Sequence, residues 1–252
     1  MIKVINKRRT GGHLFHYAHF LCDCLFPEIV CDVYNYSEVI REKSIDQTLG
    51  NFDKIYSEVS SSKCTELIKE EFDDLDVETI IYKQKEEICD KISFEKFRNF
   101  VFSQYKINPL DRDENYPEVL LIKRGHRVNL INDEQLNSIN NNYTNGKERR
   151  EINEIDKLEE YLKNHCNSLA CLYFENMDFE KQIKYFNNAK MIICAHGAVM
   201  SNMFFCKEST FIIEVTCGQI FHFFDNMSEI LNLKHIKCNN NELSEIIELI
   251  PL

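Results

Sequence analysis

Apolar runs and amphipathic stretches alternate along the C-terminal half of the chain. Apolar runs of strand length occupy residues 118–122, 169–174, 191–195 and 211–215. The stretches between them carry apolar residues at helical spacing, as Phe179, Ile183 and Phe186 do. Strands that are apolar on both faces and alternate with helices are typical of a parallel sheet covered by helices on both sides. The pattern therefore predicts an α/β fold with a Rossmann-like domain in this half.

The N-terminal half has a less regular pattern. Residues 14–26 are densely apolar and end at Pro27, and apolar residues at 94, 97 and 101 form a helical stripe. Shorter elements are expected as a strand at 30–34, a helix at 65–72 and a strand at 77–82. A break rich in charge and proline follows near 107–117. We therefore predict two lobes, a smaller one over residues 1–112 and a second over residues 113–252.

Composition and charge exclude several functional classes. The 252 residues contain 30 Lys and Arg against 41 Asp and Glu, which gives a net charge of −11. A chain this acidic lacks the clustered basic surface that nucleic-acid binding requires. No run approaches the ~18 apolar residues that cross a bilayer, and the basic N-terminus has no apolar signal region behind it. The 11 cysteines include no CxxC motif, so we expect free thiols, a cytoplasmic location and no membrane span.

The segment from Ala195 to Asn202 lies where a buried strand is expected to give way to a helix. A helix N-terminus offers free N–H groups to an anion, and ligands of open α/β sheets bind at the carboxyl ends of strands. A phosphate group beside His196, Gly197 and Ala198 is the functional interpretation, and Gly197 would allow close backbone approach. The alternative is that His196 caps the helix and Gly197 relieves a tight turn.

Two further strand ends carry charge. Arg124 and Arg127 follow the strand at 118–122, and paired arginines can clamp a diphosphate through bidentate hydrogen bonds. A solvated basic turn is the alternative. Glu214 lies in the strand at 211–215, where a carboxylate commonly holds ribose hydroxyls; a structural partner for Glu214 is the other interpretation.

A polar stripe lies within the apolar N-terminal segment. His13, His16, His19 and Asp23 would fall within an arc of about 120° if residues 13–26 are helical. Three interpretations remain open: a metal site, a general base with its orienting partner, and the polar lining of a cleft. No standard zinc spacing is present. The chain also lacks a GxGxxG motif and a P-loop, and the Asp-Arg-Asp sequence at 111–113 is interpreted as a charged loop.

The ordered set of blocks resembles glycosyltransferase family 61, which includes plant xylan xylosyl- and arabinosyltransferases and animal protein O-linked N-acetylglucosaminyltransferases. The first similar block runs from His19 to Asp23 with Pro27 behind it. The second spans residues 120–136 and contains Arg124, Arg127, Asn132 and Glu134. The third, which is the most specific, contains the Phe-Glu-Asn-Met-Asp sequence at 174–178, His196-Gly197-Ala198, Asn202 and Glu214.

The resemblance implies a GT-B architecture, in which two Rossmann-like lobes face each other across a cleft, here with a reduced N-terminal lobe. It also implies inverting, metal-independent transfer from a UDP-sugar to a hydroxyl of a glycan or protein acceptor. The UDP-sugar is a co-substrate, and no cofactor is implied. By this resemblance the lobe at 113–252 binds the nucleotide sugar and the lobe at 1–112 binds the acceptor.

Roles for individual residues follow from the same resemblance. Arg124 or Arg127 and the His196-Gly197 turn with Ala198 would hold the diphosphate, Asn202 would shape that turn, and Glu214 would hold the ribose. His19 or Asp23, with His16 as a further candidate, would be the base that deprotonates the acceptor.

Two departures from the family pattern keep other functions open. Val199 stands where the family usually has glycine, and His16 stands where it usually has asparagine. A degenerate module that binds a nucleotide or glycan without turnover is therefore an alternative, and the chain could be one part of a longer polypeptide. A metal-dependent hydrolase built on His13, His16, His19 and Asp23 is a second alternative.

Overall fold

A computed structural model describes residues 2–6, 14–34, 36–42, 48–61, 64–68, 71, 90–126, 146–218 and 222–251. His13 and Arg127, the strand expected at 77–82 and the segment with Asn132 and Glu134 lie outside these described residues. Contacts between Cα atoms divide the described chain into two compact units, one up to Lys106 and the other from Ile107 onward. The division falls shortly before the boundary expected after residue 112.

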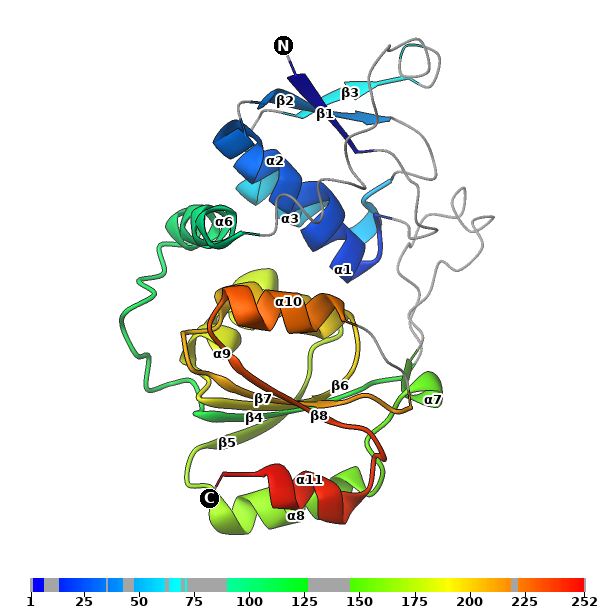
Figure 1. Ribbon diagram of the computed structural model, residues 1–252, viewed down its shortest axis with the longest axis vertical. Helices are drawn as coiled ribbons and strands as arrows, with labels where there is room; N and C mark the ends of the chain where they lie inside the picture. Colours follow the sequence, from blue (N-terminus) through cyan, green and yellow to red (C-terminus); the bar gives the residue numbers. More distant parts are fainter. Residues whose placement is uncertain are drawn as a thin grey trace. The chain divides into compact units, whose positions relative to one another are not determined.

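The second unit is built on a five-stranded parallel sheet (Figure 1). Its strands are β4 (Val119–Lys123), β5 (Leu169–Tyr173), β6 (Met191–Ala195), β7 (Phe211–Val215) and β8 (Lys234–Cys238). Every adjacent pair is parallel, in the order β5-β4-β6-β7-β8. The sheet confirms the four strands and the α/β class that the apolar pattern predicts.

Helices cover both faces of this sheet (Figure 1). Helices α8 (Ile155–His165) and α11 (Leu243–Leu249) lie on one face, and α9 (Phe179–Asn188) and α10 (Phe223–Ile230) lie on the other. Two shorter helices are α7 (Gly146–Arg149) and the 3₁₀ helix η6 (Ala198–Phe205). The helix expected after His196 is therefore present, with 3₁₀ geometry.

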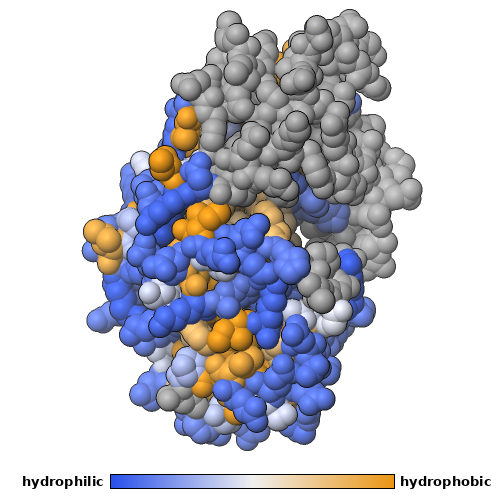
Figure 2. All heavy atoms as spheres, in the orientation of Figure 1, coloured by the Kyte–Doolittle hydropathy of each residue, from blue (hydrophilic) through white to orange (hydrophobic). Residues whose placement is uncertain are grey.

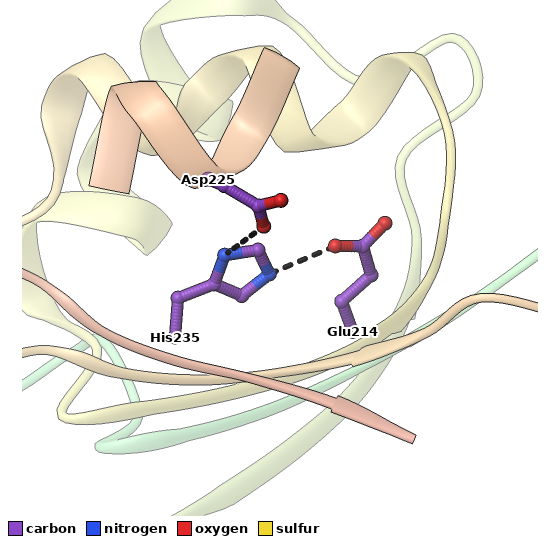
Figure 3. A group of neighbouring side chains, drawn as sticks. All are labelled: Glu214, Asp225 and His235. Carbon is purple, nitrogen blue, oxygen red and sulfur yellow. Dashed lines mark hydrogen bonds and ion pairs between the residues drawn. The ribbon is translucent and has the colours of Figure 1, made fainter. Parts of the chain in front are cut away.

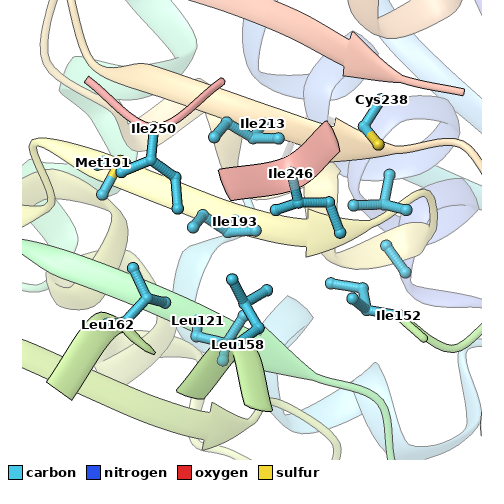
Figure 4. Packing of buried hydrophobic residues seen from close by; sticks show 12 residues of the cluster. Leu121, Ile152, Leu158, Leu162, Met191, Ile193, Ile213, Cys238, Ile246 and Ile250 are labelled. Carbon is cyan, nitrogen blue, oxygen red and sulfur yellow. The ribbon is translucent and has the colours of Figure 1, made fainter. Parts of the chain in front are cut away.

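Buried aliphatic side chains join the sheet to α8 and α11 (Figure 4). Leu121, Ile193 and Ile213 come from three adjacent strands and are all fully buried. Leu158 of α8 and Ile246 of α11 pack against them, also fully buried. Each such side chain contributes about 1.5–3 kcal/mol through its removal from water, so this core fixes the strands whose ends carry the candidate site.

The first unit holds a three-stranded parallel sheet in the order β1-β2-β3, formed by β1 (Ile2–Asn6), β2 (Tyr36–Glu42) and β3 (Cys64–Leu67). Its helical segments are α1 (Tyr17–His19), the π-helix η1 (Phe20–Leu25), α2 (Phe26–Val30), the 3₁₀ helices η2 (Cys31–Tyr34) and η4 (Gly50–Phe52), α3 (Asp53–Val59) and α6 (Lys91–Gln104). The stripe predicted on α6 is confirmed, because Phe94, Phe97 and Val101 are all buried. Phe94 and Phe97 contact the ring of Phe26 on α2.

Two predicted elements of the first unit are wrong. The strand expected at 30–34 is helical, because the helical run that contains Pro27 continues through Val30, the last residue of α2, into η2. The helix expected at 65–72 begins as strand β3, which pairs with β2 through residues 64–67. There the ion pair between Glu66 and Arg41 and the packing of Cys64 against Val39 favour the sheet.

The described surface is mostly hydrophilic on the face shown in Figure 2, with small hydrophobic patches. The large exposed hydrophobic residues are scattered singly: Ile68, Ile92, Leu110, Tyr173 and Ile236. Within the described part of the chain, no helix has both the length and the apolar character needed to cross a bilayer.

Candidate functional site

The candidate site lies where the strand order of the second unit reverses. The chain runs from β4 outward to β5 and then returns to β6 on the other side of β4. In open α/β sheets, such a switch point leaves a crevice at the carboxyl ends of the two central strands. Ile122 and Cys194 are register partners, so Arg124 and His196 leave the sheet side by side.

The structure joins these two predicted residues directly. The Nη1 atom of Arg124 donates a hydrogen bond to the carbonyl oxygen of His196 over 3.0 Å. Arg127, the other predicted arginine, lies outside the described residues. The turn that follows β4 and the turn that follows β6 are thus connected across the switch point.

A second arginine, Arg150, meets the same carbonyl oxygen. Its Nη1 atom donates to His196 O over 3.2 Å, and its side chain is buried. The sequence analysis does not identify Arg150, because it follows α7 rather than a strand. The Arg149-Arg150 pair is a signal of positive charge there, but the pattern does not indicate which arginine turns inward.

The pKa values of both guanidinium groups are lowered by burial. Burial lowers the pKa of Arg124, and the nearby Glu175 carboxylate opposes that change. Burial, reinforced by repulsion from Arg149 and Arg124, lowers the pKa of Arg150 to about 10. The acceptor that Arg124 and Arg150 share is a neutral carbonyl, and the nearby carboxylates of Glu175 and Glu214 offset part of their charge. An anionic ligand would stabilise the two guanidinium groups further.

Gly197 allows the guanidinium of Arg124 to lie against the turn. A Cβ atom at Gly197 would come within 3.0 Å of Nη1 and 3.2 Å of Nη2 of Arg124. The φ angle of Gly197 is 171°, which any residue can adopt, so space is the reason for glycine here. The group that lies close to Gly197 in the structure is the Arg124 side chain, and close backbone approach to a phosphate stays a prediction.

Glu175 lies beside the neighbouring turn. Its Oε1 atom accepts a hydrogen bond from the Gly125 N–H over 2.9 Å, whereas its buried Oε2 atom has no hydrogen-bond partner. The sequence analysis includes Glu175 only within the third family block and gives it no role. Its position after β5 brings a carboxylate to the same sheet edge as Arg124.

The imidazole of His196 points to Glu214 rather than to the start of η6. His196 Nδ1 and Glu214 Oε1 form a buried hydrogen bond. The backbone N–H of His196 donates to the carbonyl oxygen of Val215 over 2.8 Å. The N-cap position of η6 belongs to Gly197, without a side-chain cap. A capping role for the His196 side chain is therefore wrong, because Glu214 fixes it elsewhere.

Glu214 is enclosed by histidines. Its side chain is 1% exposed, and its Oε2 atom lies 2.8 Å from Nε2 of His235. Burial alone would raise the pKa of Glu214, but hydrogen bonds from His196 and His235 outweigh it and lower the pKa to about 2. Glu214 is thus an ionised, buried carboxylate with both oxygens engaged.

The remaining predicted residues of this unit lie along η6. Ala198 is exposed at its first position, and Val199 is half-buried. Asn202 is fully buried, and its Nδ2 atom donates to Gln182 Oε1 of α9 over 2.9 Å. Asn202 therefore anchors η6 to α9, and its role in shaping the turn stays a prediction.

The structure places His16, His19 and Asp23 at the start of the first helical segment of the first unit. His19 Nδ1 lies 2.6 Å from Asp23 Oδ2, and the rings of His16 and His19 lie 6.4 Å apart. The side chains of His19 and Asp23 are 33% and 16% exposed. Because a carboxylate only accepts hydrogen bonds, Nδ1 of His19 carries the proton and Nε2 is the basic nitrogen. This is the arrangement of a general base with an orienting carboxylate.

Pro27 accounts for the π-helical geometry of this segment. Proline has no N–H to donate to the carbonyl of Asp23, four residues earlier. The preceding N–H, from Phe26, donates to Leu21 O, five residues back. Such π turns occur frequently at functional sites, and this one contains Asp23.

Metal-ligand spacing occurs elsewhere in the described chain. One ligand atom each from Glu214, Asp225 and His235 lies within 4.8 Å of the others. In the N-terminal stripe, by contrast, the His19 and Asp23 groups that would bind a metal are hydrogen-bonded to each other. The sequence analysis identifies neither Asp225, which lies on α10, nor His235. The strand that carries His235 is rich in charge and has no apolar pattern.

A comparison with known families covers the His19–Asp23 pair and the arginine pair. The family model described as Glycosyltransferase 61 matches residues 17–213, from the start of α1 into β7. A search of curated proteins finds no match. The matched region includes His19, Asp23, Arg124, Arg150 and the His196-Gly197 turn. With most of its length matched, the chain belongs to glycosyltransferase family 61.

Proposed function

We propose that this glycosyltransferase transfers a sugar from a UDP-sugar to a hydroxyl of a glycan or protein acceptor, with inversion and without a metal ion. The observation that carries the proposal is the pair of arginines, half-buried Arg124 and buried Arg150, that share the His196 carbonyl at the switch point. A diphosphate is the ligand whose charge and geometry suit two guanidinium groups.

The donor diphosphate would contact Arg124, Arg150 and the first N–H groups of η6. Each guanidinium has five N–H donors, so an arginine that contacts the His196 carbonyl can also contact a phosphate. Arg127 remains a further candidate from the sequence. We assign the ribose contact to a group other than Glu214, because Glu214 is buried and both its oxygens face histidines.

The reaction would be a single displacement at the anomeric carbon. The acceptor oxygen forms a bond to that carbon while the bond to the β-phosphate oxygen breaks, and the base takes the acceptor proton. The His19–Asp23 pair would be that base. Arg124 and Arg150 would stabilise the negative charge on departing UDP, which is the task a metal performs in other transferases.

This mechanism requires a GT-B arrangement, in which the base and the donor site come from different lobes. Support comes from the division of the chain into two units, each with its own parallel sheet. The base pair lies in the first unit and the arginine pair in the second.

A panel of nucleotides tests the donor class. In calorimetric titrations we expect UDP to bind and UMP to bind more weakly, since UMP lacks the β-phosphate that the second arginine would contact. Uridine should show no measurable binding. Equal affinities for UDP, UMP and uridine would contradict a diphosphate site at the arginines.

Turnover requires a separate assay. The protein is incubated with a panel of UDP-sugars and glycan acceptors, and released UDP is measured. Release that depends on an acceptor is expected for the transferase, whereas UDP binding without any release would favour the degenerate binding module.

A further inference from the structure

Three acid and base side chains, Glu214, His235 and Asp225, lie in a row (Figure 3). Glu214, at one end of the row, contacts His196. Glu214 bonds the His196 imidazole through Oε1 and His235 Nε2 through Oε2, the latter over 2.8 Å. On the other side of the His235 ring, Nδ1 lies 3.6 Å from Oδ1 of Asp225. We call Glu214, His235 and Asp225 the buried relay, after the buried side chains of Glu214 and His235; the Asp225 side chain, at the outer end, is 32% exposed. All three residues lie beyond the residues 17–213 that the family model matches.

Neighbouring strands β7 and β8 place the side chains of Glu214 and His235 on the same face of the sheet. His235 of β8 is the register partner of Ile212, two residues before Glu214 in β7. Side chains two residues apart on a strand point to the same face, so Glu214 and His235 share a face. That face is the one covered by α10, which supplies Asp225.

Hydrogen-bond chemistry determines the proton positions. An ionised carboxylate only accepts, so Nδ1 of His196 and Nε2 of His235 must both be N–H groups. With Nε2–H of His235 donated to Glu214, the Nδ1 atom of the ring faces Asp225 at 3.6 Å. Arranged this way, Glu214 cannot rotate without losing one of two partners.

We propose that the buried relay positions His196 for donor binding, by fixing its imidazole as the Nδ1–H tautomer beside the arginine pair. The inference rests on the proposed diphosphate site. Four hydrogen bonds then hold His196. Its backbone N–H donates to Val215, its carbonyl oxygen accepts from Arg124 and Arg150, and its ring contacts Glu214. Glu214, His235 and Asp225 are positioning residues, because they act through His196.

A divalent cation bound by the same three residues is the competing use of this cluster. The surrounding charges disfavour it. Lys237 Nζ lies 2.6 Å from Asp225 Oδ2, and His222 Nδ1 lies 3.1 Å from the same oxygen. A cation would have to lie near the Lys237 ammonium and replace the contacts of His235 with both carboxylates. Asp225 is therefore already supplied with positive partners.

The test uses the state of the His196 ring in the whole protein without ligand. With histidine rings labelled with ¹⁵N, NMR distinguishes the two neutral tautomers, and His196→Gln assigns the signal. We expect Nδ1–H in the wild type. His235→Leu should give a mixture of tautomers, because Glu214 loses its second partner. His235→Gln should restore Nδ1–H, since its amide can donate to Glu214.

Binding of UDP provides the second measurement. We expect His235→Leu to weaken UDP binding about tenfold, the scale seen when an outer partner of a ligating histidine is removed, and His235→Gln to recover most of it. His165→Leu is the matched control, because His165 is an exposed histidine at the end of α8. Asp225→Asn gives the same comparison with a smaller shift if His235→Leu does not fold.

The outcomes separate the relay from the proposed function. An unchanged His196 ring in folded His235→Leu would overturn the relay, whether or not UDP binds. Stoichiometric Mn²⁺ binding that His235→Leu abolishes would overturn it in favour of a metal site. A wild type that does not bind UDP, with a His196 tautomer that still depends on His235, would refute the donor site and support the relay.

Discussion

The main chain and the side chain of His196 are held by different partners. Two arginines contact its carbonyl oxygen, and Glu214 contacts its imidazole. Sites that hold their binding groups in place before the ligand arrives lose less free energy on binding. At the scale of residues, we therefore expect substitutions at Gly197 and Glu214 to disturb the position of His196 and Arg124.

Gly197→Ala tests the close packing of Arg124 on the turn. The added Cβ would lie 3.0 Å from Nη1 of Arg124, so the guanidinium must move. Because the arginine side chain is flexible and the φ angle suits alanine, we expect a change in unfolding free energy within about 1 kcal/mol. UDP affinity should fall about tenfold, since small displacements of positioning groups have large effects. Calorimetry gives this value, and Gly125→Ala, whose Cβ meets Glu175 at 3.4 Å, is the milder comparison. Unaltered affinity in Gly197→Ala would show that Arg124 does not hold the ligand.

The lowered pKa of Glu214 predicts acid sensitivity. Its folded-state pKa of about 2 lies below the value of about 4.3 for an unfolded glutamate. The stabilisation, up to about 3 kcal/mol, is therefore complete above about pH 4.5 and is lost as the pH falls toward 2. Urea unfolding at pH 6 and pH 3 should show a smaller loss in Glu214→Gln than in the wild type. Glu160→Gln, an exposed glutamate on α8, should behave as the wild type does. The same pH dependence in all three proteins would refute the assignment.

Residues that follow buried strands could be predicted, and residues that reach the site from elsewhere could not. Arg124 and His196 come directly after apolar runs, so the sequence alone places them at the sheet edge. Arg150 arrives from the end of α7, and its inward orientation depends on tertiary packing. The partner of Glu214 was also hidden, because His235 lies in a segment without an apolar pattern.

Elements set the limits of sequence-based prediction in the same way. The central strands are buried on both faces and appear as continuous apolar runs. The edge strand β8 has the sequence Lys-His-Ile-Lys-Cys, and Lys234 and Ile236 are exposed. The hydrophobic pattern therefore does not predict this strand. In the first unit, β3 has only four residues, and its pairing with β2 overrides a helical pattern.

The helix η6 depends on a buried amide contact. Asn202 donates to Gln182 of α9, and both residues are buried. Asn202→Ala leaves the Gln182 amide without this partner, so we expect the unfolding free energy to fall by about 1–3 kcal/mol. Chemical denaturation measures the change.

A matched control separates this contact from the general effect of losing an asparagine. Asn164→Ala removes an exposed asparagine from α8 and should alter stability by no more than about 0.5 kcal/mol. If the two variants are equally stable, Asn202 does not anchor η6.

The whole molecule combines two units, each with a parallel sheet and its own set of candidate residues. The alternation of apolar runs and helical stripes is sufficient to predict the α/β class, because it extends from residue 118 to residue 215. The sequence pattern is weaker in the first unit, where α1, η1 and α2 follow one another around Pro27. There the spacing of His19 and Asp23 was sufficient to predict that the two side chains lie together, whereas the π-helical geometry of the segment could not be predicted.

Because the proposed base and the arginine pair lie in different units, we expect mutations of the base to change the transfer rate without changing UDP affinity. His19→Gln should lower the transfer rate by about 10²–10⁴-fold, the usual effect of removing a general base. UDP affinity should remain unchanged, because the arginine pair belongs to the second unit. Acceptor-dependent UDP release and calorimetry measure the two quantities.

Two further variants identify the base. His16→Gln should have the smaller effect on rate, since Asp23 orients His19, and the exposed His165→Gln should have none. A rate that responds to His16 and not to His19 would transfer the role of base to His16.

The dissociation constant of UDP in Arg150→Ala tests the central claim most directly. Arg150 is buried at the switch point, whereas Arg112 forms an ion pair with Glu118 in the same unit and provides the matched control. Loss of one charge-assisted contact predicts at least a tenfold weaker affinity in Arg150→Ala and wild-type affinity in Arg112→Ala. Equal UDP affinity in the wild type and both variants would contradict a diphosphate site at the arginine pair.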